Sequence, residues 1–151
     1  MMKTDRFENF VLLIESVHKC INKVKQEIIL ESSIKSVHTL WLYKLLQSPE
    51  GLTATEIAAK SGIDRSLVSR EIRALIKSGY IVTENEEGKR GYNARITLTE
   101  PGKVIAERIA AEALSVQEAV SRDISKDELE TFYEVLEKIS YNLDGMTEKG
   151  K

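Results

Sequence analysis

The sequence predicts a mainly α-helical (α+β) protein with one two-stranded β-hairpin, and three observations support this fold class. Apolar residues recur at three- and four-residue steps over most of the 151 residues, as they do on one face of an α-helix. Only two short runs, 80–83 and 94–98, carry the β-branched and aromatic residues typical of strands. Capping residues and glycines separate the helical stretches from one another.

Residues 53–78 have the pattern of two short helices joined by a tight turn. Thr53 and Glu56 form a capping box, in which each side chain can accept a hydrogen bond from a free backbone N–H. Gly62 can end the first helix with a positive φ, and Asp64 can cap a second helix over 65–78. This spacing predicts a helix-turn-helix. A helix over 34–47, capped by Ser33 or Ser36, is expected to precede it.

The second of these helices carries a polar stripe that could read DNA. Serine, arginine and lysine side chains can donate to phosphate, and arginine can also form a fork with guanine in the major groove. A basic stripe by itself is more often a solvated helix face. Its place on the second helix of a helix-turn-helix favours DNA contact. The predicted contacts on this helix are Arg65, Ser66, Ser69, Arg70, Arg73 and Lys77.

A basic hairpin tip follows the helix-turn-helix. The polar loop 84–93 joins the two strand-like runs and carries the pair Lys89 and Arg90. Such a hairpin beside a helix-turn-helix is typical of a wing, whose arginine can enter the negatively charged minor groove. The alternative for the pair alone is an ordinary exposed turn.

The motifs together resemble one known family. The run LTATEIAAKSGIDRSLVSREIRALIKSGYI, followed by GKRGYNARITLTEPG, resembles the MarR family of winged-helix regulators, closely over residues 34–102. The resemblance implies a winged helix-turn-helix over 34–99, with Ser66, Ser69, Arg70 and Arg73 on the DNA-facing helix and Arg90 on the wing. One position departs from the family pattern, because Gly88 stands where an aspartate often braces the wing arginine.

Apolar seams at both ends of the chain predict a homodimer. Helices are expected over 5–31 and over 100–143, the latter interrupted near 122–125, so that the whole chain, 1–151, forms one MarR-like domain with terminal dimerisation helices. The first and last helices repeat apolar residues at heptad spacing, which indicates burial in a partner, although burial in the protein's own core is the alternative. The predicted interface residues are Phe10, Ile14, Val17, Ile21, Phe132, Leu136, Ile139 and Leu143. A dimer would place two reading helices ~34 Å apart, which suits an inverted repeat in duplex DNA.

Composition and charge limit the function classes. The net charge is −2, but residues 65–82 hold four basic side chains against one acidic, whereas residues 100–151 hold seven against twelve. The predicted DNA-facing segment is therefore locally positive. No apolar run approaches the ~20 residues that cross a bilayer, and the charged N-terminus lacks a signal-peptide core, so no membrane partner and a cytoplasmic location are expected.

Few residues suggest a metal-binding, catalytic or ligand-binding site. Two histidines and one cysteine predict no metal site, and no motif for nucleophilic catalysis or phosphate binding occurs, so neither an enzyme nor a cofactor is expected. Some members of the family that the chain resembles sense oxidants through a cysteine in the N-terminal helix. Cys20 also lies on the first predicted helix, although a lone helical cysteine is usually only a small apolar residue. The same resemblance implies a small-molecule pocket near His38, Trp41 and Tyr43, with a core position as the alternative for Trp41.

Three function classes therefore remain to be weighed. The leading prediction is a homodimeric, sequence-specific regulator of transcription, a repressor that a small-molecule effector releases from duplex DNA. The second is a winged-helix module whose basic stripe contacts an acidic protein. The third, a small enzyme, is disfavoured because no set of residues converges on a reaction.

Overall fold

The structure, a computed structural model, describes residues 3–32, 34–84 and 94–148. The chain divides into two compact units, residues 1–112 and residues 113–151, and each unit is described separately. The boundary falls inside a helix, so the first unit contains the winged-helix part together with the N-terminal helix. The expected single domain over the whole chain stays a prediction.

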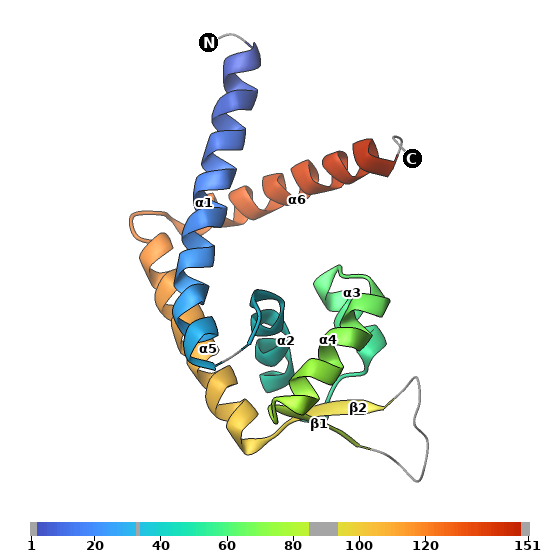
Figure 1. The fold of residues 1–151 in the computed structure, drawn as a ribbon. Coiled ribbons are helices and arrows are strands. Elements are labelled where there is room, and N and C mark those ends of the chain that lie inside the picture. The colour runs from blue at the N-terminus through green and yellow to red at the C-terminus, as the bar shows by residue number, and fades with distance from the viewer. Residues whose placement is uncertain (1–2, 33, 85–93, 149–151) are drawn as a thin grey trace. The chain divides into compact units, whose positions relative to one another are not determined.

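The first unit consists of helices and one hairpin, which confirms the predicted fold class (Figure 1). A long helix, α1 (Lys3–Ser32), leads into the three short helices α2 (Ser36–Leu46), α3 (Ala54–Ser61) and α4 (Arg65–Lys77). The strands β1 (Ile81–Glu84) and β2 (Arg95–Leu98) follow, and then α5 (Glu100–Val120) begins. The sequence-based boundaries of these elements agree with the structure to within a few residues.

One apolar core holds the short helices against the hairpin. Trp41 and Leu42 of α2 are 1% and 0% exposed, and Val68 and Leu75 of α4 are 0% and 1% exposed. Burying a side chain of this size stabilises the fold by roughly 1.5–3 kcal/mol. The other buried apolar residues are Ile28, Ile34, Leu45, Leu52, Ile57, Ile72, Ile81, Ile96, Ala106 and Ile109. Every element of the first unit thus contributes to the same core.

The hairpin is antiparallel and gains a further pairing from the chain before α3. Its register pairs Ile81 with Leu98 and Glu84 with Arg95. Leu52 also bridges to Ile96, because each residue donates its backbone N–H to the carbonyl of the other, at 3.1 and 2.9 Å. Gly51 permits this approach: its φ is +86°, and a Cβ there would lie 2.8 Å from the carbonyl oxygen of Ile96.

Two helices start with capping boxes, and the first of them confirms the prediction at Thr53 and Glu56. In the capping box of α3, Glu56 N–H donates to the Thr53 hydroxyl at 3.1 Å, and Thr53 N–H donates to the Glu56 carboxylate at 2.9 Å. The start of α6 (Lys126–Glu148) has the same arrangement between Ser125 and Glu128.

Of two other capping predictions, the one at Ser36 is wrong and the one at Asp64 is right in position only. Ser36 is the first residue of α2, so Lys35 occupies the capping position, and Ser33 lies outside the described residues. Asp64 precedes α4 as expected, but its carboxylate accepts the Ser66 hydroxyl and makes no hydrogen bond to the helix backbone. At Asp64 the nearby Ser66 hydroxyl competes for the carboxylate that would otherwise cap the helix.

The second unit consists of the end of α5 and of α6. Asp123 has a positive φ of 61° in the turn between the two helices. None of the residues of α6 is buried: Phe132 and Leu143 are about half exposed, and Leu136 and Ile139 are intermediate. The helix also continues past residue 143, where the sequence pattern had placed its end.

No helix in the described parts of the chain is both long and apolar enough to cross a membrane.

Candidate nucleic-acid interface

The helix pair α3 and α4 is built around a glycine turn. Gly62 adopts a left-handed conformation with φ of +64°, and its N–H donates to the Ala58 carbonyl. Ile63 N–H donates to the same carbonyl at 3.3 Å, so the last turn of α3 is closed before the chain enters α4. Ile57 and Val68 are buried where the two helices meet the core. This local geometry is a helix-turn-helix, as the sequence predicted.

The polar stripe of α4 faces solvent because the opposite face of the helix is held by the core. Val68, Ile72 and Leu75 are buried. With 3.6 residues per turn, positions 66, 70, 73 and 77 then fall on the far side of the helix. The structure exposes the side chains of four of the six predicted contacts on α4, namely Ser66, Arg70, Arg73 and Lys77. Arg65 and Ser69 lie at the border of the stripe and are half-buried.

Glu71 is the residue in this region that sequence reasoning missed. It is 5% exposed, and its carboxylate receives two donors from the segment that opens α2. Lys35 Nζ lies 2.9 Å from Glu71 Oε1, and His38 Nε2 lies 2.9 Å from Glu71 Oε2. Hydrogen bonding by Lys35 holds the pKa of Glu71 below its usual value, although burial opposes that shift. The group is therefore a buried carboxylate with its charge satisfied.

His38 is fixed in one protonation state by its partners. The backbone N–H of Lys35 donates to His38 Nδ1 at 3.1 Å, so Nδ1 is an acceptor and Nε2 carries the proton that is donated to Glu71. Burial is the largest influence on His38 and lowers its pKa, despite the neighbouring carboxylate. The only sequence signal for this cluster was a single acid among the basic residues of α4, because its partners are more than 30 positions away.

A second set of contacts fixes the junction between α4, the hairpin and α5. The Tyr80 hydroxyl donates to the carbonyl of Ser32 at the end of α1, at 2.7 Å. Thr99 donates its N–H to the Tyr80 carbonyl at 3.0 Å and its hydroxyl to the Gly79 carbonyl at 2.6 Å. Gly102 donates its N–H to the Thr99 oxygen at 3.1 Å. The Leu98-Thr99-x-x-Gly102 motif is thus the cap that starts α5 against the end of α4.

The wing is described only at its base. Lys89, Arg90 and Gly88 lie outside the described residues, so the role of the wing tip stays a prediction. At the base, Arg95 is exposed, and its Nη1 donates to the Gly51 carbonyl at 3.0 Å.

The three residues of the predicted ligand pocket lie on α2 with different exposures. Trp41 and His38 are 1% and 3% exposed, with ring centroids 5.8 Å apart, and Tyr43 is half-buried. The indole Nε1 of Trp41 is buried and has no hydrogen-bond partner among the described residues. The alternative of a core position for Trp41 therefore agrees with the structure, and ligand binding stays a prediction.

The seam residues of α1 that were predicted to form a dimer interface remain accessible in the single chain. Ile14, Val17 and Ile21 are 40%, 56% and 43% exposed, and Phe10 is half-buried. Cys20 is exposed on the same helix as a free thiol. At its other end α1 is tied to α5, where Arg108 donates to the Glu31 carboxylate and lowers the pKa of that carboxyl.

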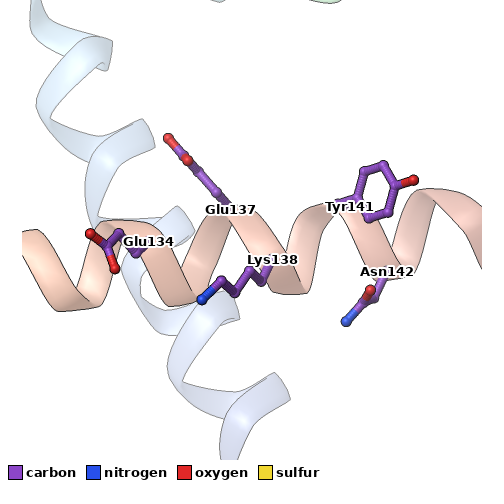
Figure 2. A pocket seen from close by; sticks show the side chains of 5 residues that line it. All are labelled: Glu134, Glu137, Lys138, Tyr141 and Asn142. Atoms are coloured by element: carbon purple, nitrogen blue, oxygen red, sulfur yellow. The ribbon is translucent and has the colours of Figure 1, made fainter.

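Figure 2 shows a hollow on the surface of α6, lined by Glu134, Glu137, Lys138, Tyr141 and Asn142. All five side chains come from one helix, so within the second unit no opposing wall would enclose a ligand. In the described segments, no group of three or more His, Cys, Asp or Glu side chains is placed to hold a metal ion. The polar stripe of α4 is consequently the strongest candidate site.

The fold and the exposed stripe define a winged helix-turn-helix protein. Residues 34–91 match the MarR family. A transcriptional regulator from Bacillus cereus is 30% identical over 95 residues, which are 62% of this chain and 62% of that protein. The regulator TcaR of Staphylococcus aureus (strain Newman) is 25% identical over 95 residues, 62% of this chain and 63% of its own length. The matches thus span less than two thirds of these relatives.

Solved structures confirm the fold over nearly the whole chain. A MarR protein from Peptoclostridium difficile aligns with a TM-score of 0.74 at 23% identity, covering 95% of this chain and 92% of that one. A MarR family regulator from Listeria monocytogenes, complexed with 26mer DNA, aligns with a TM-score of 0.72 at 18% identity, covering 88% and 87%.

Proposed function

We propose that this protein is a sequence-specific DNA-binding regulator of transcription that acts as a homodimer. The observation that carries the proposal is the exposed stripe of α4, Ser66, Arg70, Arg73 and Lys77, which lies opposite the buried face of the second helix of a helix-turn-helix. This arrangement suits a helix that enters the major groove. The DNA complex of the Listeria relative supports the proposal by analogy.

The residues of the stripe would divide the recognition of DNA. Arg70 and Arg73 have planar guanidinium groups that can form two hydrogen bonds with guanine O6 and N7. Ser66 and Lys77 are suited to phosphate oxygens, which position the helix without reading sequence. In the proposal Lys89 and Arg90 of the wing add contacts in the minor groove, where a narrow groove attracts guanidinium.

The proposal of a dimer rests on apolar side chains that are exposed to solvent in the single chain. On α1 the exposed seam includes Phe7, Val17 and Ile21, and on α6 it includes Phe132 and Leu143. Several large apolar side chains exposed along one helix mark an interaction site. A symmetric dimer would present two copies of α4 about one DNA turn apart, ~34 Å, so the proposed target is an inverted repeat.

A repressor that a small effector releases from DNA is the finer form of the proposal. The buried indole N–H of Trp41, which lacks an acceptor among the described residues, supports an effector site beside His38 and Trp41. A Staphylococcus aureus MarR structure contains salicylate and kanamycin, which makes salicylate a reasonable first probe. Trp41 is the only tryptophan of the chain, so its fluorescence should change on titration with salicylate if the site exists.

Selection of bound sequences from a random duplex pool tests the DNA-binding proposal directly. The expected result is an enriched inverted repeat whose half-sites are centred about 10–10.5 base pairs apart, or a multiple of that spacing. No enrichment over unselected duplexes would contradict the proposal and favour the alternative of a protein-interaction module.

Regulation by oxidation of Cys20 is the remaining alternative. Exchange of the thiol, Cys20→Ser, should leave DNA binding unchanged both without and with peroxide treatment. Release of the wild type, but not of this variant, by peroxide would establish Cys20 as a redox sensor.

A further inference from the structure

The carboxylate of Glu71 lies beside three basic side chains, two of them cationic, from two helices and the segment before α2. Oε1 lies 2.9 Å from Lys35 Nζ and 3.9 Å from Arg70 Nε, and Oε2 lies 2.9 Å from His38 Nε2. The side chain of Glu71 is 7% exposed, whereas that of Arg70 is 73% exposed. A fixed, buried anion therefore stands at the base of an exposed arginine of the DNA-facing stripe.

We propose that Glu71 is a positioning residue for Arg70, and that Lys35 and His38 hold the carboxylate in place for this purpose. The inference rests on the DNA-binding function proposed above. The contact uses Nε of Arg70, the nitrogen nearest the backbone. The two terminal nitrogens of the guanidinium are then left as the fork that guanine or phosphate requires.

Only a carboxylate satisfies the partners that surround this position. The ammonium group of Lys35 can only donate hydrogen bonds. The proton of His38 lies on Nε2, because Nδ1 already accepts a hydrogen bond from the backbone N–H of Lys35. Both oxygens of Glu71 must therefore accept. A glutamine would offer one oxygen, and its amide nitrogen would face the second donor.

The advantage for recognition is that Arg70 loses less freedom when DNA binds. A long side chain that is ordered before binding gives up less conformational entropy on contact. Lys35 moderates the effect, because it shares Oε1 and so weakens the attraction between Glu71 and Arg70. Removal of the Glu71 carboxylate and removal of the Lys35 ammonium should therefore have opposite effects on Arg70.

The free protein gives the first test, through hydrogen exchange of the Arg70 Nε–H measured by ¹⁵N NMR. Arg70→Lys assigns the signal. Glu71→Gln should speed the exchange, because the carboxylate is lost. Lys35→Gln, a change at an exposed side chain that leaves the core intact, should slow it, because Arg70 becomes the competing cation on Oε1. Unchanged exchange in both variants overturns the inference.

Duplex binding gives the second test, as the ratio of affinities for the selected operator and a scrambled duplex. Glu71→Gln should lower this ratio about tenfold, within the range for one misdirected base contact. Glu50→Gln is the matched control. Glu50 is exposed in the turn between α2 and α3, and the substitution removes the same charge, so the ratio should stay unchanged. A merely structural role would lower binding to both duplexes alike.

A double-mutant cycle decides whether Glu71 acts through Arg70. In an Arg70→Ala background, Glu71→Gln should change the ratio by less than twofold. An equal loss in both backgrounds overturns the inference. If the wild type bound no duplex at all, the proposed function would fail, and the exchange of the Arg70 Nε–H would still show whether Glu71 holds the arginine.

Discussion

Gly102→Ala should destabilise the protein although it places a better helix former inside α5. The backbone of residue 102 lies against the junction of α4 and the hairpin, where a Cβ would be 1.9 Å from the Tyr80 carbonyl oxygen and 2.9 Å from its carbon. Real Cβ atoms do not approach backbone oxygens this closely, so the first turn of α5 must move away by more than 1 Å.

The size of the effect follows from the hydrogen bonds that this movement breaks. Thr99 and Gly102 make three of them at the junction, with lengths of 3.0, 2.6 and 3.1 Å. At about 1 kcal/mol each, their loss costs about 3 kcal/mol. Alanine recovers only about 0.5–1 kcal/mol relative to glycine in a helix. The expected net loss is therefore about 2 kcal/mol in the free energy of unfolding.

Urea denaturation followed by circular dichroism measures this difference. Gly145→Ala provides the matched control, because it lies inside α6 and a Cβ there meets nothing within 4 Å. The control should be neutral or more stable by up to about 1 kcal/mol. If Gly102→Ala were as stable as the wild type, the assignment of Thr99 and Gly102 as the rigid start of α5 would be refuted.

Three further predictions concern recognition, acidity and assembly. Arg73→Ala should weaken operator binding by ~2–6 kcal/mol per dimer if Arg73 reads a base. Arg90→Ala should weaken binding to operator and scrambled duplexes alike. Fluorescence anisotropy at two salt concentrations separates the two effects. The unfolding free energy should decline as the pH falls below about 6.5, the ordinary pKa of histidine, because the folded pKa of His38 is lowered and the unfolded chain takes up the proton first. A second decline in the unfolding free energy should begin near pH 4.5, because the folded pKa of Glu71 is also lowered from its ordinary value. In His38→Gln, denaturation measured across this pH range should show a smaller first decline. Ile21→Glu should convert the dimer into a 17.0 kDa monomer, as measured by light scattering, because an unpaired charge in an apolar interface is costly. A wild type that is monomeric at micromolar concentration would contradict the proposed dimer.

The local features of this fold could be read from the sequence because they depend on neighbours in the chain. The Thr53 and Glu56 capping box, the left-handed Gly62 and the apolar spacing of α4 each act over three to seven residues. The exposed positions of Ser66, Arg70, Arg73 and Lys77 followed from the same helical period once the core face was known. The capping bond of Asp64 failed because it depended on which of two nearby polar groups the carboxylate would bind, and α2 begins at Ser36, so Lys35 takes the capping position expected for a serine.

The tertiary structure alone decided the contacts that join distant parts of the chain. Glu71 resembled any charged residue of a solvated helix, and its burial against His38 and Lys35 depends on how α2 packs against α4. Likewise, the family motif marked Gly102 as a feature of the sequence, but only the approach of the Tyr80 carbonyl shows why a side chain is excluded there. Helical periodicity determines which face of each element is apolar. The pairing of buried polar groups is set by the three-dimensional packing, since partners 33 residues apart leave no periodic signal in the sequence.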